Sequence, residues 1–356
     1  MKKPFSQLLK ASRLARKGRP LSAALVVASL GRPPKPKRKR AQTIAKRPSP
    51  PSAPPRRPPA GSFVAGRFDG PGGERTYKLY TPRGSMRRRL PLVVMLHGCG
   101  QTAADFAIGT GMNRLADELG FLVLYPEQSL SASLARCWNW QRPGDQKRGL
   151  GEPAAIAGLT REIMLTCKAN PARVYVCGMS AGGAAAAILA STYPELYLAA
   201  GVHSGPAREN VSTLADALGV MRNGPRPQTP TNATRHRPAI VFHGDQDAVV
   251  HPSNAARFLS QLQRSSRRPL ISATEQGRSH GGRAYTRTVY RHDGGEALLE
   301  EWTVHGAGHG WSGGSGAGSH TDPAGPDASR EMMRFFLARK RPAPKPRAKP
   351  LAPPKA

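Results

Sequence analysis

The clearest chemical signal in the sequence is a serine flanked by glycines, in the pentapeptide Gly178-Met179-Ser180-Ala181-Gly182. The pentapeptide follows the apolar run RVYVC, which is typical of a buried strand, and precedes AGGAAAAILAS, which is typical of a helix. A tight turn between a strand and a helix presents a serine hydroxyl as a nucleophile, and the glycines let neighbouring backbone pass close by. The pattern therefore predicts that Ser180 is a catalytic nucleophile.

A serine hydroxyl is a weak nucleophile, so it needs a base that is itself oriented by a carboxylate. In this strand–turn–helix arrangement the acid and then the histidine follow the serine along the chain. His309 lies in a glycine-flanked loop after EEWTV and is the predicted base, and Asp247 lies in a turn after AIVF and is the predicted acid. Asp247 is favoured over Asp245 because it lies further into its loop, whereas His305 still belongs to the strand and is expected to be structural.

A glycine-rich turn, HGCGQ, ends another apolar run, PLVVML. Such a turn can direct backbone N–H groups at the oxyanion of a tetrahedral intermediate. We expect the N–H of Cys99 to be one donor and the N–H of Ala181, at the start of a helix, to be the second. In an oxidising compartment the Cys99 thiol could pair with Cys137, and an inert buried thiol is the open alternative.

Three of the four tryptophans lie near these motifs in the sequence, at Trp138, Trp140 and Trp311. They could line an acyl or aromatic substrate cleft, and simple packing is the alternative interpretation. The cysteines and histidines lack the spacing of metal ligands. We therefore expect no metal site.

The elements that must position these residues alternate between strand and helix. The predicted strands span residues 76–80, 92–96, 121–125, 174–177, 198–202 and 239–242, and the predicted helices span residues 112–119, 152–168, 181–193, 253–263 and 327–337. The segments 284–290 and 297–304 form a predicted hairpin across Asp293-Gly294. This alternation predicts an α/β fold with a mainly parallel sheet, helices on both faces and functional residues at the carboxyl ends of the strands.

The charge of the chain is concentrated at its ends. The 356 residues include 54 Lys and Arg against 22 Asp and Glu, a net charge of +32. Residues 1–60 hold 17 basic and no acidic residues, and residues 339–356 hold 7 basic and none acidic, which leaves a net of +8 for residues 61–338. A protein that is basic throughout, as histones are, is therefore excluded.

This composition predicts four regions along the chain. Residues 1–30 are a short helical segment, 31–61 a disordered Pro/Lys/Arg-rich linker, 62–340 the catalytic domain and 341–356 a disordered basic tail. The basic ends could bind nucleic acid or anionic surfaces non-specifically, and solvated tails are the alternative.

No run of 18 apolar residues occurs, so no ordinary transmembrane helix is predicted. The apolar run Leu21–Leu30 follows a basic stretch, as in a secretory signal, but no clear cleavage site follows it. Export and a cytoplasmic location both remain open.

The motifs together resemble the polyhydroxybutyrate (PHB) depolymerase family of esterases, α/β-hydrolases related to feruloyl and acetylxylan esterases. The resemblance covers roughly residues 62–338 and is carried by LHGCGQTAADF, CWNW, GEPAAIAGL, RVYVCGMSAGGA, GVHSG, VFHGDQDAVVHP, YTRTVY and WTVHGAGHGWSGGSGAGSHTDPAGPDAS. It implies the α/β-hydrolase fold, a triad of Ser180, Asp247 and His309, and ester hydrolysis without a metal or organic cofactor.

The resemblance also implies polyhydroxyalkanoate or related short-chain hydroxyacyl esters as substrates, and an extracellular location. The unclear secretory signal and the Pro/Lys/Arg-rich linker depart from the family's pattern and put export in doubt. Two alternatives stay open: a feruloyl or acetylxylan type of carbohydrate esterase, and a granule- or polyanion-binding protein that acts through its basic tails.

Overall fold

The computed structural model describes residues 61–339, apart from residues 85–88, 210 and 226–236. The predicted helical segment 1–30, almost all of the linker 31–61 and the tail 341–356 lie outside the described residues. Within the described part, no helix is long and apolar enough to cross a membrane.

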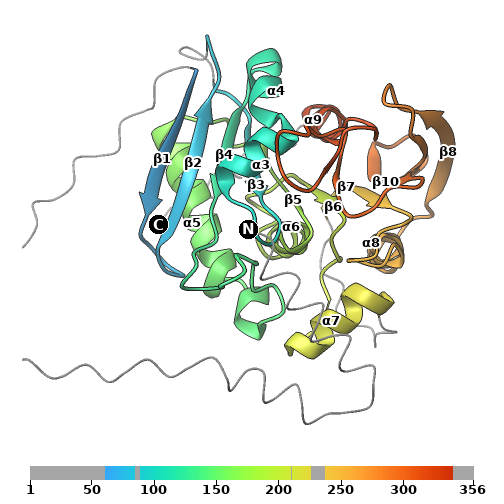
Figure 1. Cartoon of the computed structure of the whole chain (residues 1–356), viewed down its shortest axis with the longest axis horizontal. Coiled ribbons are helices and arrows are strands. Elements are labelled where there is room, and N and C mark those ends of the chain that lie inside the picture. Colours follow the sequence, from blue (N-terminus) through green and yellow to red (C-terminus); the bar gives the residue numbers. More distant parts are fainter. Residues whose placement is uncertain (1–60, 85–88, 210, 226–236, 340–356) are drawn as a thin grey trace, which may run out of the picture. The chain divides into compact units, whose positions relative to one another are not determined.

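The described residues form a ten-stranded sheet in the order β1-β2-β4-β3-β5-β6-β7-β10-β9-β8 (Figure 1). Its strands are β1 (Ser62–Phe68), β2 (Arg75–Thr81), β3 (Leu92–Leu96), β4 (Leu122–Pro126), β5 (Val174–Met179), β6 (Ala199–His203), β7 (Ala239–Gly244), β8 (Ile271–Arg278), β9 (Ala284–Arg291) and β10 (Ala297–Val304). The strands from β4 to β10 in this order are parallel, and the two outer strands at each side pair antiparallel. The predicted, mainly parallel sheet is confirmed.

Helices cover both faces of this sheet (Figure 1). They are α3 (Ala103–Thr110), α4 (Met112–Leu119), α5 (Gly151–Thr166), α6 (Ala181–Thr192), α7 (Leu214–Asn223), α8 (Ser253–Ser265) and α9 (Ala328–Leu337), with a 3-10 turn, η1, at Pro143–Gln146. Alternate residues of β3 show the two layers: Val94 packs with α5 and α6, whereas Val93 packs with α3, α4 and α9. The fully buried strands explain why their sequences are continuous apolar runs.

The predicted hairpin is confirmed as β9 and β10, which pair antiparallel. The sequence interpretation missed β1, β8, α3 and α7. In β8 nearly every side chain is exposed, so the strand shows no alternation between apolar and polar residues. Two short strands, β11 (Trp311–Ser312) and β12 (Thr321–Asp322), pair within the loop that follows β10.

Candidate active site

Ser180 occupies a strained turn between β5 and α6. Its backbone angles, φ 56° and ψ −121°, lie in a region that residues other than glycine rarely adopt. A hydrogen bond of 2.9 Å from the Ser180 N–H to the His203 carbonyl holds the turn against β6. A Cβ on Gly182 would lie 2.1 Å from the Leu96 carbonyl oxygen, so the motif needs glycine there because β3 passes so close. The local geometry is that of a nucleophile elbow.

His309 and Asp247 meet at the carboxyl ends of β10 and β7. The Nδ1 atom of His309 lies 2.8 Å from Oδ2 of Asp247, and the Asp247 side chain is completely buried. The other carboxylate oxygen accepts hydrogen bonds of 2.9 Å from the N–H groups of Val249 and Val250. Burial raises the pKa of Asp247, but the bonds from His309 and Val250 outweigh it, so the pKa lies below its ordinary value. The carboxylate is therefore charged and fixed in place.

Two buried histidines lie close to this pair. His243 donates from Nε2 to the Val250 carbonyl at 2.8 Å, and the same atom lies 3.5 Å from Asp247. Burial lowers the pKa of His243, and it lowers the pKa of His203 to about 3. Both rings are therefore neutral at pH 7.

A second aspartate–histidine pair lies in the same two loops. His305 Nδ1 is 2.9 Å from Oδ2 of Asp245, its Nε2 is 2.9 Å from the Thr286 hydroxyl, and the Gly306 N–H donates to Asp245 at 2.7 Å. Both side chains are partly exposed, at 42% for His305 and 33% for Asp245. This pair joins the loops after β7 and β10, and both ring nitrogens of His305 are occupied.

The turn after β3 lies beside Ser180. A Cβ placed on Gly98 would be 3.8 Å from the Ser180 Cβ. The Gly98 N–H is bound to Gln101 Oε1 at 2.9 Å and the Gly100 N–H to a carbonyl at 2.7 Å, whereas the N–H of Cys99 between them has no acceptor among the described residues. Between these two bonded N–H groups, that of Cys99 is therefore available to another hydrogen-bond acceptor.

A disulfide joins Cys99 to Cys137, the pairing that the sequence left open. The Gly100 N–H donates to the Ala135 carbonyl, so a backbone hydrogen bond adjoins the covalent link. Cys167 and Cys177 are buried and do not take part in this disulfide. The turn is therefore fastened to the segment after β4 by two bonds.

The tryptophans pack the interior instead of lining an open cleft. Trp138, Trp140 and Trp311 are exposed by 1%, 5% and 1%, respectively. The indole N–H of Trp138 donates to the His97 carbonyl at 2.9 Å, and that of Trp311 donates to the Ser329 hydroxyl at 3.0 Å. Trp138 and Trp311 are therefore packed in the core with their N–H groups satisfied, whereas Trp140 is buried but lines a small cavity.

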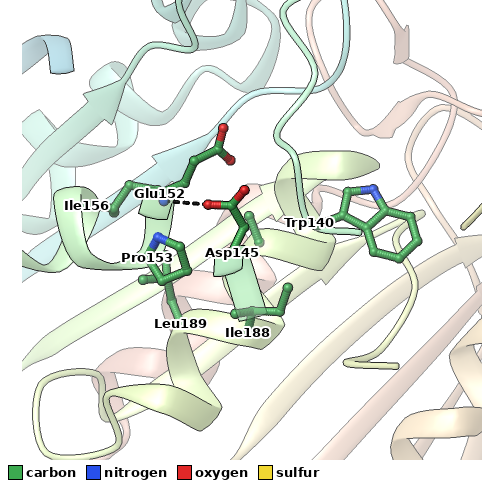
Figure 2. Close-up of a pocket in the computed structure, with 8 residues that line it drawn as sticks. Trp140, Asp145, Glu152, Pro153, Ile156, Ile188 and Leu189 are labelled. Carbon is green, nitrogen blue, oxygen red and sulfur yellow. Dashed lines mark hydrogen bonds between the residues drawn. The ribbon is translucent and has the colours of Figure 1, made fainter. Parts of the chain in front are cut away.

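A small cavity lies between η1, α5 and α6 (Figure 2). It is lined by Trp140, Asp145, Glu152, Pro153, Ile156, Ala185, Ile188 and Leu189. The Glu152 N–H donates to Asp145 at 2.7 Å, and the Glu152 carboxylate accepts from Gln128 and Asn139. Burial raises the pKa of Glu152. Neither Ser180 nor His309 lines this cavity.

Two site features escaped the sequence interpretation. Gln101 is buried and binds the N–H of Gly98, and Ser319, more than two hundred residues later, contacts Gln101. The glutamine in HGCGQ was visible in the sequence, but nothing in the sequence pairs it with Ser319. Among the described residues, no group of three or more His, Cys, Asp or Glu side chains could hold a metal ion.

Residues 75–287 match the family described as esterase PHB depolymerase. The chain belongs to this esterase family. It is 31% identical over 255 residues to poly(3-hydroxyalkanoate) depolymerase C of Paucimonas lemoignei, an alignment that covers 67% of this chain and 59% of the depolymerase. It is 29% identical over 269 residues to feruloyl esterase B of Neurospora crassa, which covers 69% of this chain and 82% of that protein.

Acetylxylan esterase A of Talaromyces purpureogenus is 30% identical over 214 residues, or 55% of each chain. The match thus spans about three fifths of the depolymerase and about half of this acetylxylan esterase. Among solved structures, the acetyl xylan esterase from Aspergillus awamori has a TM-score of 0.59 at 20% identity, over 78% of this chain and 99% of that chain. This likeness shows the fold, which is the α/β-hydrolase fold.

Proposed function

We propose that this member of the PHB depolymerase esterase family is a serine hydrolase of carboxylic esters, with Ser180, His309 and Asp247 as its triad and residues 62–340 as its catalytic domain. The observation that carries the proposal is the buried Asp247 carboxylate, 2.8 Å from His309, at the carboxyl ends of β7 and β10 in the same sheet whose strand β5 ends in the strained turn of Ser180. Family membership supports the same reaction.

In this proposal each residue of the triad takes one step. The hydrogen bond from His309 Nδ1 to Asp247 leaves Nε2 unprotonated, so Nε2 takes the proton of the Ser180 hydroxyl as it attacks the ester carbonyl. The resulting imidazolium is stabilised by the charged Asp247. It then gives the proton to the leaving alcohol as the acyl-enzyme forms. In the second half of the reaction His309 takes a proton from water, the water oxygen attacks the acyl carbonyl, and the proton passes to the Ser180 oxygen as its ester bond breaks.

Two backbone N–H groups bind the oxyanion of the tetrahedral intermediate in this proposal. The Cys99 N–H is without an acceptor among the described residues, and Ala181 opens α6, where the first N–H groups have no acceptor within the helix. The positive end of the helix dipole at Ser180 favours the same negative charge. Donors of this kind are each worth about 100- to 1000-fold in rate.

The proposed substrates are polyhydroxyalkanoates or related short-chain hydroxyacyl esters, as the name of the Paucimonas relative indicates. Feruloyl and acetylxylan esters are the second candidate, because two relatives carry these activities in their names. Release of acid from hydroxybutyrate oligomers, PHB granules, feruloyl esters and acetylated xylan separates the two. Turnover of the sugar esters alone would exclude the first candidate.

The triad is tested with a fluorophosphonate probe and with turnover of p-nitrophenyl butyrate. We expect labelling and turnover by the parent, and neither by Ser180→Ala. The matched control is Ser191→Ala, which should behave as the parent. Ser191 lies within α6, and its hydroxyl donates to the Ile188 carbonyl at 2.8 Å. Equal labelling of the Ser180→Ala variant would contradict the proposal.

We also propose that the basic ends of the chain bind anionic surfaces or nucleic acid non-specifically. Residues 1–60 and 339–356 together hold 24 basic and no acidic residues. Binding of this kind releases counterions and weakens steeply as salt rises.

A further inference from the structure

Gln101 makes hydrogen bonds that only an amide side chain can make. It is 2% exposed and follows the proposed oxyanion turn. Its Oε1 accepts from the Gly98 N–H at 2.9 Å, and its Nε2 donates to Asp105 Oδ2 at 3.0 Å and to the Ser319 carbonyl at 3.1 Å. The Gly98 N–H needs an acceptor, whereas Asp105 and the Ser319 carbonyl need donors, and these opposite needs fix which way the Gln101 amide is oriented.

The partners of the Gln101 amide belong to the segment that follows His309. Asp105, in the first turn of α3, accepts from the Ser319 N–H at 3.0 Å and also from the Ser319 hydroxyl. The N–H of Ser315 donates to the Gly109 carbonyl of α3 at 2.8 Å. Residues 315–319 are therefore fastened to α3.

A backbone hydrogen bond also joins the end of this segment to Trp311, two residues after His309. The N–H of Trp311 donates to the His320 carbonyl at 2.7 Å, and β11 pairs with β12 next to it. His320 has a φ of 54°, so the chain bends there in a conformation that is unusual for a residue with a side chain. The hydrogen bond between Trp311 and His320 closes a loop that begins two residues after His309, and Ser319 directly precedes the closing residue His320.

We propose that Gln101 is a positioning residue that couples the oxyanion turn to the loop carrying His309. By holding the Gly98 N–H, it leaves the next N–H, that of Cys99, as the donor that faces the substrate. By donating to Asp105 and Ser319, it fixes that turn relative to the segment after the base. The inference rests on the proposed serine hydrolase function.

The test compares Gln101→Ala with the parent in p-nitrophenyl butyrate turnover and in affinity for a boronic acid that mimics the tetrahedral intermediate. We expect kcat to fall about 10- to 100-fold, because a displaced oxyanion donor loses part of the 100- to 1000-fold effect of a removed one. The KM should stay within about two-fold, and the boronic acid should lose affinity in parallel with kcat.

Gln101→Glu supplies a readout that a purely structural role would not produce. The introduced carboxyl keeps an acceptor for the Gly98 N–H, but when ionised it faces Asp105 and the Ser319 carbonyl without a proton to donate. Repulsion from Asp105 raises the pKa of this carboxyl, and protonation restores a donor. The ratio of variant to parent kcat should therefore rise as the pH falls from 8 to 5.

Gln146→Ala is the matched control. Gln146 is also a buried glutamine, 8% exposed, and its amide donates to the Val211 carbonyl at 2.8 Å, but it has no bond to the proposed site. Its kcat should equal that of the parent. If Gln101→Ala does not fold, Ser319→Ala replaces it, with an expected loss of about five-fold in kcat for removed hydrogen bonds.

The outcomes separate this inference from the proposed function. A parent that turns over ester, with Gln101→Ala at the parent's kcat, or with a Gln101→Glu ratio that does not change with pH, overturns the positioning role alone. A Gln101→Ala variant in which KM rises and kcat stays at the parent's value would also overturn the positioning role. A parent that neither labels with fluorophosphonate nor hydrolyses ester overturns the serine hydrolase proposal, and the positioning role with it.

Discussion

At the scale of single residues, two aspartates two positions apart have different surroundings. The Asp247 side chain is completely buried, accepts hydrogen bonds from two backbone N–H groups and contacts His309. The Asp245 side chain is partly exposed and contacts His305. Asp247→Asn should lower kcat about 10,000-fold, because the amide can hold the imidazole in the wrong tautomer. Asp245→Asn is the control and should lose less than ten-fold. Equal effects of the two variants on p-nitrophenyl butyrate turnover would exclude Asp247 as the acid.

Two buried histidines predict how stability depends on pH. Burial lowers the pKa of His97 to about 4 and that of His203 to about 3, from an ordinary value near 6.5. Below pH 6.5 the unfolded chain binds protons that these rings cannot accept when folded, so the free energy of unfolding should fall as the pH drops from about 6.5 to 4. Urea unfolding at pH 7.5, 6 and 5 measures this slope, and His203→Gln should make it shallower. A slope unchanged in that variant would assign the effect to other groups.

Residues in turns that directly follow apolar strands could be singled out from the sequence. The surroundings of Ser180 are set by its own strand, turn and helix, and the turns holding Asp247 and His309 follow apolar strands. The role of Gln101 depends on Ser319, which is 218 positions away, and that contact forms only after the loop folds onto α3. Similarly, the sequence could not choose between a cleft and the core for Trp138, because only the fold provides the His97 carbonyl that its N–H binds.

At the scale of elements, strands buried on both faces were readily predicted, and exposed or short elements were not. β3 and β4 are completely buried and read as apolar runs. β8 is the outermost strand and is exposed along nearly its whole length, so its sequence, ISATEQGR, carries no periodic signal. Hydrophobic periodicity arises because one face of an element is buried, so it cannot predict an element that has no buried face.

The turn after β3 gives a prediction at this same scale, because the Cys99–Cys137 disulfide fastens it to the segment after β4. Because the cysteines are 38 positions apart in the sequence, the disulfide should stabilise the folded state by up to about 4 kcal/mol by restricting the unfolded chain. Reduction, or the double variant Cys99→Ser/Cys137→Ser, should lower the Tm and lower kcat more than it changes KM. The double variant should then be insensitive to dithiothreitol, and Cys167→Ser should respond to it as the parent does. A parent whose kcat is unaffected by full reduction would show that the turn holds its shape without the link.

At the scale of the whole molecule, the described region presents its proposed active site at one edge of the sheet and its chain junctions at the other. Ser180, Asp247 and His309 follow the carboxyl ends of β5, β7 and β10. Gly61 precedes β1 and bonds the Thr81 carbonyl at the end of β2, which runs antiparallel to β4. Arg339, after α9, bonds the Ala297 carbonyl where β10 begins. Both junctions therefore lie at the edge where the parallel strands start.

This separation predicts that the basic ends act on location and not on catalysis. Deleting residues 1–60 and 340–356 removes 23 of the 54 basic residues and no acidic ones, which reduces the net charge from +32 to +9. Binding to vesicles of anionic lipid at 50 mM salt should fall at least ten-fold, because each basic residue near such a surface contributes about 1 kcal/mol. Turnover of p-nitrophenyl butyrate should stay within two-fold, because both junctions lie at the edge opposite Ser180. The parent's binding should weaken steeply between 50 and 200 mM salt. Vesicle binding that survives the deletion would place the anionic contact on residues 61–339, and a loss of turnover would show that the ends reach the catalytic edge.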